Sequence, residues 1–252
     1  MYCHAIVYGR WRSQGKDMPE ASRPAAVGAG GTAEFSPVRR SVSLAEEVYE
    51  AIFQQLMALK VAPGARITVD TLARELKVSQ TPIREALGRL EGEGLVVKTH
   101  LVGYSAAPQI SRRRFDDLYD LRLSLEPIGA RRAAEIMTDE KMVELADAAA
   151  VMSKRGPADA RQRYSLFARQ DASFHDTIMD LAGNQLIRET LSHQHTHFHI
   201  FRLMFHARVT DEALDEHAAI IAAFKSRAPT EAERAMRVHI ERSRDRLIPA
   251  FE

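Results

Sequence analysis

The spacing of apolar residues predicts that the first folded segment begins with an amphipathic helix. From Leu44 to Leu56 an apolar residue recurs at every fourth position, which gives one apolar helix face. Residues 43–46 form a capping-box pattern, in which a serine side chain can accept a hydrogen bond from the first free backbone N–H groups. Residues 68–76 and a segment that starts at Ser79 predict two further helices.

The next segments predict a small wing and then a long helical region. Residues 95–97 and 104–106 read as two short strands joined by a turn at Gly103. We therefore expect a mostly α fold: an N-terminal winged helix-turn-helix of three helices with a two-stranded wing, then an all-α antiparallel bundle of six helices. The six helices are expected at roughly 112–136, 139–154, 158–182, 184–207, 211–227 and 231–250.

These patterns divide the chain into three regions. Residues 1–40 are rich in glycine and proline and have no sustained periodicity, which predicts a flexible tail. Residues 41–107 are expected to form the winged helix-turn-helix, and residues 112–250 the helical domain. A length of 252 residues is sufficient for two domains that each bury a core.

Composition narrows the class of protein. Hydrophobic residues make up 45% of the chain, and Cys3 is its only cysteine, so we expect a globular protein without disulfides. No apolar run is long enough to span a membrane and no secretion signal is recognisable, which favours a cytoplasmic protein with no membrane partner. The net charge of +1 does not by itself indicate a nucleic-acid partner.

The third predicted helix has an outward face that suits DNA. Its apolar positions recur at helical spacing and can pack inward: Ile83, Ala86, Leu87 and Leu90. Its first residues and outward positions are polar: Ser79, Gln80, Thr81, Arg84 and Arg89. A helix N-terminus can bind phosphate, and an arginine one turn further can reach a base edge in the major groove. The alternative is an ordinary charged helix surface.

Histidines in the second half suggest a metal site. Asp171 and His175 are four residues apart on one helix face, and His217 and His239 have apolar neighbours at helical spacing. One carboxylate and three imidazoles that converge in a bundle core can bind a divalent metal, whereas separate core histidines would only bond to nearby carbonyls. The histidine-rich run 193–199 reads as a partly solvated cluster, although one of its side chains could line a pocket.

The N-terminal motif resembles a known family. Residues 44–107 look like the winged helix of GntR-family regulators, and residues 79–96 match the family signature nearly position by position. The resemblance implies that Thr81 and Arg84 contact DNA and that Gly103, at the wing tip, approaches the minor groove.

Two positions depart from that pattern. Gln80 stands where the FadR-like subfamily usually has arginine, and Asp70 aligns with a second DNA-contacting arginine. Glutamine can still read adenine, so we expect a changed operator preference rather than a lost contact.

The C-terminal half resembles the FCD domain, the ligand-binding domain of FadR-like regulators. The matching pieces are residues 116–122, 171–175, 182–184 and 216–220. In the metal-binding branch, the matching positions imply that the metal ligands are Asp171, His175, His217 and His239. Zn²⁺, Ni²⁺ or Mn²⁺ would suit this ligand set.

Together these features predict a metabolite-responsive transcriptional regulator, either a repressor or an activator, with repression favoured. We expect a homodimer on a near-palindromic double-stranded DNA operator, with a small organic acid as effector. Arg122 could pair with the effector carboxylate, and Asn184 and Arg202 could also contact it, although helix capping explains Asn184 more simply. A metalloregulator remains an alternative, and a metal-dependent hydrolase is less suitable because no glutamate is spaced as a general base.

Overall fold

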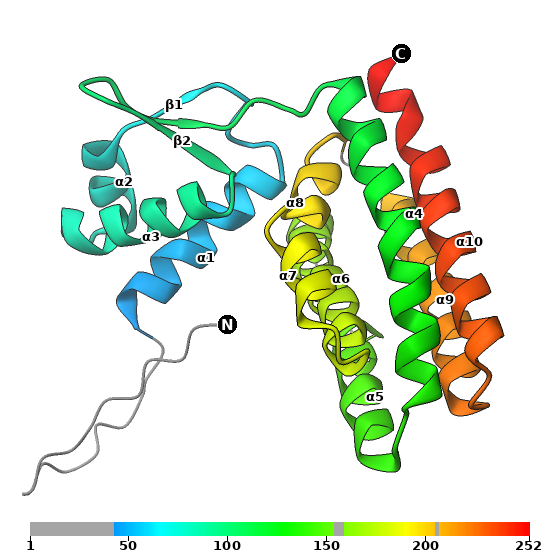
Figure 1. The fold of residues 1–252 in the computed structure, drawn as a ribbon. Coiled ribbons are helices and arrows are strands. Elements are labelled where there is room, and N and C mark those ends of the chain that lie inside the picture. Colours follow the sequence, from blue (N-terminus) through cyan, green and yellow to red (C-terminus); the bar gives the residue numbers. More distant parts are fainter. Residues whose placement is uncertain (1–42, 154–158, 205–206) are drawn as a thin grey trace, which may run out of the picture. The chain divides into compact units, whose positions relative to one another are not determined.

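A computed structural model describes the chain over residues 43–153, 159–204 and 207–252. The predicted tail, residues 1–40, lies outside the described residues. Within them the fold is mostly helical, with a small antiparallel sheet in its N-terminal part (Figure 1). The order of three helices, a strand hairpin and a long series of helices confirms the expected fold class.

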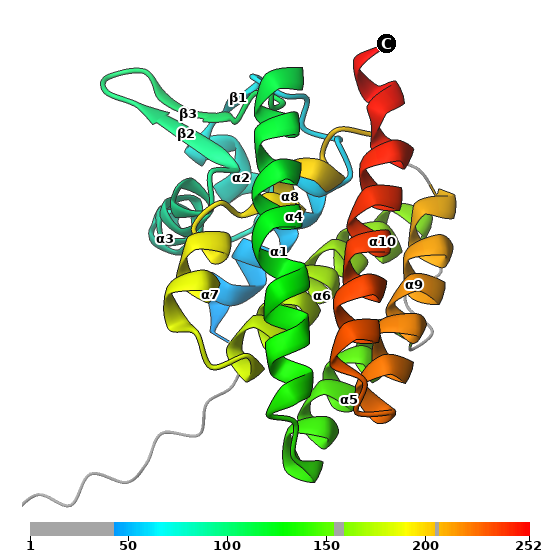
Figure 2. The same ribbon diagram turned by 45° about the vertical axis from the view of Figure 1, so that its right-hand side comes forward.

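The N-terminal part of the described chain is a winged helix-turn-helix. Its elements are α1 (Leu44–Met57), β1 (Arg66–Ile67), α2 (Val69–Leu76), α3 (Gln80–Gly92), β2 (Val96–Thr99) and β3 (Gly103–Ala106). The strands pair antiparallel in the order β1-β3-β2, and the β2–β3 hairpin forms the wing (Figure 2). The sequence predicted only two strands, because two residues are too few to show the alternation that marks β1.

Caps and burial explain where these helices lie. Ser43 accepts a hydrogen bond from the Glu46 N–H at 3.1 Å, as the capping pattern predicts. Lys77 ends α2 in a left-handed conformation (φ 56°), so the chain turns sharply into α3. The predicted inward face of α3 is completely buried: Ile83, Ala86, Leu87 and Leu90. Burial of each larger side chain contributes about 1.5–3 kcal/mol, which holds α3 by one face and leaves the other exposed.

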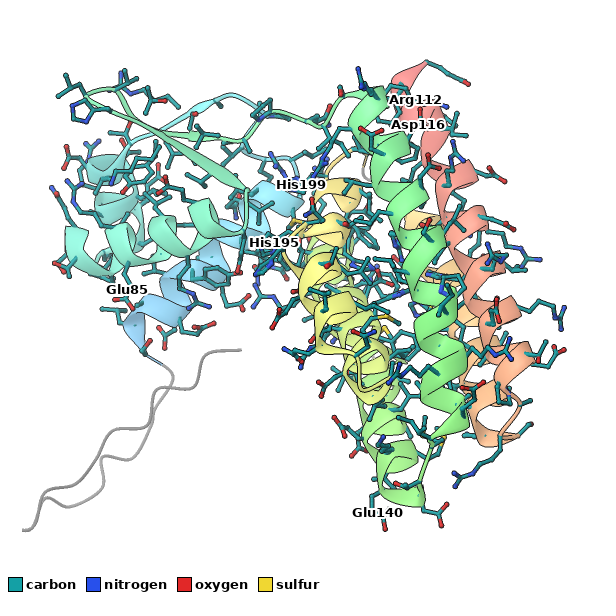
Figure 3. The ribbon with its side chains drawn as sticks, viewed as in Figure 1. Glu85, Arg112, Asp116, Glu140, His195 and His199 are labelled. Atoms are coloured by element: carbon teal, nitrogen blue, oxygen red, sulfur yellow. The ribbon has the colours of Figure 1, made fainter. Side chains whose placement is uncertain are left out.

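Seven helices and a final 3-10 helix make up the rest of the described chain. They are α4 (Arg112–Glu135), α5 (Asp139–Ser153), α6 (Ala160–Leu181), α7 (Gln185–Ser192), α8 (Thr196–Phe201), α9 (Ala207–Lys225), α10 (Pro229–Leu247) and η1 (Ile248–Phe251). α10 packs between α4 and α9, and α5 packs against α6 and α9 (Figures 1 and 2). α4 runs from Arg112 and Asp116 to the turn before Glu140 (Figure 3). None of the described helices is both long and apolar enough for a membrane span.

Several helix boundaries differ from the sequence-based prediction; α9, for example, spans Ala207–Lys225 where a helix at 211–227 was expected. The single helix expected at 184–207 is interrupted: α7 ends at Ser192, and α8 follows His195, whose φ of 44° departs from a helical path. This conformation costs a residue with a side chain roughly 1–2 kcal/mol, so the surrounding packing must hold it. α10 begins at Pro229 rather than at residue 231, because the fixed φ of proline suits the first turn of a helix.

Candidate metal centre and DNA-reading helix

The four predicted metal ligands meet inside the helical domain. Asp171 and His175 lie one turn apart on α6, while His217 comes from α9 and His239 from α10. All four are buried, and one potential ligand atom from each lies within 4.8 Å of the others. Two ligand atoms on one ion are at most about 4.2 Å apart, because each metal–ligand bond is about 2.1 Å long. Small side-chain shifts would therefore close this set around an ion.

The cluster leaves buried imidazole nitrogens without protein partners. His217 Nε2 lies 3.2 Å from Asp171 Oδ1, and neither ring nitrogen of His217 has a hydrogen-bond partner. His175 Nε2 and His239 Nε2 face each other at 3.2 Å. An unpaired buried polar atom destabilises a fold by about 1–3 kcal/mol, and a shared cation removes that penalty. The donor set therefore fits a divalent metal.

Two carboxylates orient the imidazoles from behind. Glu126 on α4 lies 2.6 Å from His175 Nδ1, and Glu216 on α9 lies 2.9 Å from His239 Nδ1. An ionised carboxylate can only accept a hydrogen bond, so each imidazole carries its proton on Nδ1 and directs the Nε2 lone pair into the cluster. Sequence reasoning missed both glutamates. The available signals were the position of Glu216 beside His217 and the i,i+4 spacing of Glu126 from an arginine.

Arginines neutralise these two carboxylates. Arg122 Nε donates to Glu126 Oε1 at 2.5 Å, and both side chains are almost completely buried. Arg246 donates to both oxygens of Glu216, at 2.6 and 3.0 Å. Burial alone would raise the pKa of Glu126, but Arg122 and His175 hold it well below its usual range. Burial likewise opposes ionisation of Glu216, yet His239 and Arg246 lower its pKa to about 2.

The protonation states of the ligands suit metal binding. Burial lowers the pKa of His239 to about 3 and also lowers the pKa of His217. Burial would raise the pKa of Asp171, but the proximity of His217, and then of His197 and His175, lowers it instead. Neutral imidazoles and an ionised carboxylate are the forms that bind a cation. Asp171, His217 and His239 are therefore in forms that can bind a cation at neutral pH.

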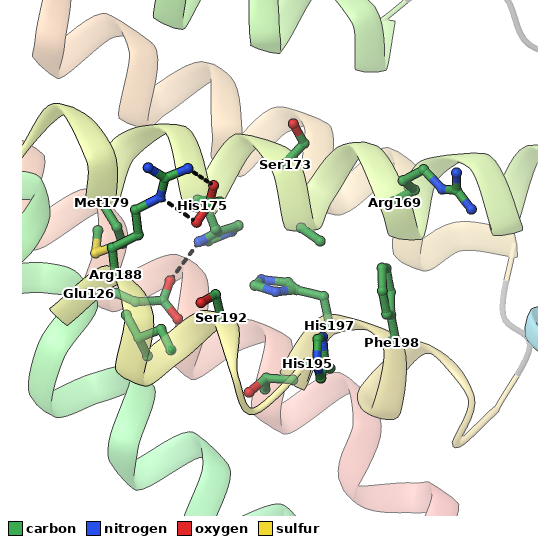
Figure 4. A pocket seen from close by; sticks show the side chains of 14 residues that line it. Glu126, Arg169, Ser173, His175, Met179, Arg188, Ser192, His195, His197 and Phe198 are labelled. Atoms are coloured by element: carbon green, nitrogen blue, oxygen red, sulfur yellow. Dashed lines mark hydrogen bonds and ion pairs between the residues drawn. The ribbon is translucent and has the colours of Figure 1, made fainter. Parts of the chain in front are cut away.

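A cavity of about 290 Å³ opens beside the cluster, between α6, α7 and α8 (Figure 4). Its lining includes Glu126 and His175, so it reaches the cluster. Arg188, also in the lining, is paired with Asp176 through two hydrogen bonds of 2.7 and 3.0 Å. Much of the remaining wall is small or apolar: Ala172, Ser173, Met179, Leu191, Ser192, Thr196 and Phe198. A small molecule in this cavity would contact the side of the cluster formed by His175.

The three residues predicted to contact an effector lie outside the lining of this cavity. Arg122 is held in its buried ion pair. Asn184 caps α7 by accepting a hydrogen bond from the Ile187 N–H at 3.3 Å. Arg202 donates to the carbonyl of Ala107 at 2.7 Å. Each residue thus has a contact within the protein, and its contact with an effector stays a prediction.

The break before α8 separates the histidines of residues 193–199. His193 is exposed. His199 lies against Gly94, just after α3 (Figure 3): if Gly94 carried a Cβ atom, that atom would be 3.2 Å from His199 Nε2. His195 and His197 both line the cavity. Burial lowers the pKa of His197 well below its usual value, so this imidazole is neutral. Two members of a run that the sequence suggested to be a solvated cluster therefore line the cavity.

The residues predicted to contact DNA lie on exposed parts of the winged helix-turn-helix. Those at the start and on the outer face of α3 are Ser79, Gln80, Thr81, Arg84 and Arg89. Ser79 is the N-cap of α3 but makes no capping hydrogen bond, so its side chain does not occupy the first N–H groups of the helix. Gly103 opens β3 with a φ of 109°, a conformation that favours glycine.

The two positions that depart from the family pattern contact each other. Gln80 Nε2 donates to Asp70 Oδ1 at 2.6 Å, and Arg84 donates to Gln80 Oε1 at 3.1 Å. Asp70 therefore orients the amide of Gln80, which in turn holds Arg84 on the exposed face. Arg89 differs, because it forms an ion pair with Glu46 and so ties α3 to α1.

Comparison with known proteins identifies both parts of the chain. Residues 44–104 match the family described as bacterial regulatory proteins, gntR family, and residues 117–242 match the FCD domain. The Nta operon transcriptional regulator of Aminobacter aminovorans is 36% identical over 129 residues, which cover 51% of this chain and 59% of that protein. The HTH-type transcriptional repressor RspR of Escherichia coli is 25% identical over 198 residues, 78% of this chain and 85% of that protein.

A solved structure shares the fold. McbR/YncC of E. coli superimposes with a TM-score of 0.62 at 19% identity, covering 84% of this chain and 100% of that one. The matched families and named relatives are DNA-binding transcriptional regulators and not enzymes. This chain therefore belongs to the GntR family of bacterial transcriptional regulators and fits its FadR-like branch, in which an FCD domain follows the winged helix-turn-helix.

Proposed function

We propose that this regulator senses a small organic acid through a divalent metal held by Asp171, His175, His217 and His239. The observation that carries the proposal is the convergence of four buried ligand atoms from three helices, with both ring nitrogens of His217 unpartnered. One carboxylate and three imidazoles suit Zn²⁺, Ni²⁺ or Mn²⁺. The ion would supply a positive centre for a carboxylate of the effector.

The cavity beside the cluster supports a small polar effector. Thr196 Oγ1 and His197 Nε2 are buried in its wall without hydrogen-bond partners, so both can bond to a carboxylate or hydroxyl group. Sugar acids, hydroxy acids and dicarboxylates all offer such groups. Arg122, Asn184 and Arg202 are held in contacts within the protein, so we expect them to contact the effector only if the bundle rearranges.

The exposed face of α3 supports DNA reading by a homodimer. We propose that residues 41–107 form the DNA-binding domain and residues 112–250 the sensing domain. The first turn of α3 would bind phosphate, Arg84 would reach a base edge, and Gly103 would let the wing approach the minor groove. Two such domains would meet the two half-sites of a near-palindromic operator. The likeness to a relative described as a repressor supports repression as the outcome.

Metal content tests the sensing half of the proposal. We expect the purified wild-type protein to hold about one divalent ion per chain in elemental analysis after dialysis, because the four candidate ligand atoms lie within 4.8 Å of one another. The double variant His217→Ala/His239→Ala should hold none, while His193→Ala, which changes an exposed histidine, should keep the ion. Full occupancy in the double variant would contradict the site.

A gel shift with DNA from upstream of the gene tests the DNA-reading half. Arg84→Ala should lose about 1–3 kcal/mol of sequence discrimination, which is roughly 5–150-fold in relative affinity. Arg113→Ala removes another exposed arginine, at the start of α4, and should bind as the wild type does. An unchanged sequence preference in Arg84→Ala would defeat the assignment. Operator affinity that follows free metal without any metabolite would favour a metalloregulator instead.

A further inference from the structure

A fourth histidine faces the metal cluster from the cavity. His197 Nε2 lies 3.6 Å from Asp171 Oδ2, and the centre of its ring lies 4.6 Å from that of His175. Figure 4 shows the ring projecting from α8 toward His175 on α6. The Nε2 atom is buried but has no hydrogen-bond partner. Such an atom requires an explanation, and here it is directed at residues that together can hold a cation.

The support of His197 differs from that of the other imidazoles. Glu126 and Glu216 fix His175 and His239 from behind, and these histidines belong to helices of about twenty residues. His197 instead lies on a helix of six residues, directly after the positive φ of His195. A short segment beside a break opens more easily than the middle of a long packed helix.

We propose that His197 is a fifth and displaceable ligand, which binds the ion from the cavity side until an effector carboxylate takes the same position. The inference rests on the proposed metal site. Zinc sites accept a fifth ligand, and nickel and manganese commonly bind more than four. His197 and an effector in the cavity would then compete for one position, so effector binding would release His197.

The contacts of α8 connect this exchange to the DNA-binding part. The ring of Phe198 packs edge-on against Phe53 of α1, with 5.2 Å between ring centres. Arg202, directly after α8, bonds to the carbonyl of Ala107, which follows the wing. α1 in turn packs against α3. Release of His197 would therefore alter the position of α8, which contacts α1, and α1 in turn supports α3.

Cobalt tests the inference directly, because the visible absorption of Co²⁺ weakens when a fifth ligand joins four. The wild type, His197→Gln and the control His199→Gln, from the same helix, are freed of metal and titrated with Co²⁺. We expect stronger absorption and about tenfold weaker Co²⁺ binding only in His197→Gln. Acetate, as a simple carboxylate probe, should bind the cobalt form of His197→Gln about tenfold more tightly than that of the wild type, because it displaces no imidazole.

The possible failures are distinguishable. Equal spectra and equal Co²⁺ and acetate affinities in the wild type and His197→Gln would overturn the inference and leave the four-ligand site intact. A wild-type protein that binds no Co²⁺ would refute the proposed metal site and this inference with it. Circular dichroism checks the fold, and His197→Asn replaces His197→Gln in the same titrations if that variant is misfolded.

Discussion

The substitution Glu126→Gln separates the two roles of one buried carboxylate. Glu126 is 2% exposed and bonds both to Arg122, at 2.5 Å, and to His175 Nδ1, at 2.6 Å. Glutamine keeps the size of the side chain but removes the charge that neutralises Arg122. Breaking a buried ion pair in this way costs about 3–5 kcal/mol, because the remaining charge is uncompensated. Loss of the carboxylate behind His175 should also weaken metal binding by about 10–100-fold.

α4 supplies a matched control. Arg131 and Glu135 repeat the residue types and the i,i+4 spacing of Arg122 and Glu126. Their Nε–Oε1 contact is 3.0 Å, but their side chains are about half exposed. Glu135→Gln should leave the free energy of unfolding and the metal affinity almost unchanged, because solvent screens an exposed pair. Urea unfolding of the metal-free proteins measures the stability, and titration with Zn²⁺ measures the affinity.

A double variant then distinguishes charge from orientation. Arg122→Met/Glu126→Gln removes both charges, so we expect stability to recover by a few kcal/mol while the metal affinity stays low. Unfolding of Glu126→Gln at the same urea concentration as Glu135→Gln would refute the buried pair. A normal Zn²⁺ affinity in Glu126→Gln would refute the role of Glu126 in orienting His175.

Three further outcomes follow from the same contacts. Asp70→Ala should shift the operator preference in a DNA selection experiment without unfolding the protein, because it removes the contact that orients the Gln80 amide, which in turn holds Arg84. An unchanged preference would argue against this linkage. Removal of the ion with a chelator should lower the melting temperature by on the order of 10 °C, because a ligand at 1,000 times its Kd adds about 4 kcal/mol to the free energy of unfolding. Equal melting curves with and without chelator would contradict this. The metal-free protein should lose stability as the pH falls below about 6.5, because His239, with its pKa lowered to about 3, stays neutral when folded and takes up a proton when unfolded. That histidine alone accounts for about 2 kcal/mol at pH 5, and urea midpoints that do not change between pH 7 and pH 5 would rule it out.

The comparison of two pairs on α4 shows why sequence reasoning missed part of the site. Arg122–Glu126 and Arg131–Glu135 are indistinguishable by residue type and spacing, yet one is buried beside the ligands and the other is on the surface. Their difference comes from the helices that pack over each turn, which local sequence does not encode. Glu126 therefore becomes visible as a support for His175 only once α6 and α4 are placed together.

The convergence of the candidate metal ligands was predictable from the sequence to different degrees. The spacing of Asp171 and His175 puts them on one helix face without further knowledge. The convergence of His217 and His239 with them depends on how α9 and α10 pack, and only the resemblance to a known domain supplied that information. Which histidine of residues 193–199 would line the pocket could not be decided, for another reason. No glycine or proline marks the break before α8, so the sequence predicted one continuous helix at 184–207. The break at His195 changes which side chains after it share a face with those before it, and a continuous helix therefore does not give the direction of His197.

The arrangement of supports indicates which part of the site can carry a signal. Glu126 and Glu216 hold their histidines through contacts that are already formed within the protein, and all four candidate metal ligands are buried. A divalent ion held by such side chains would be a fixed component of the site rather than the variable that is sensed. The cavity side is different, since it is bounded by a six-residue helix with an unpartnered imidazole. We therefore infer that information enters through what occupies the cavity, and that the ion serves as the fixed point against which that occupant is bound.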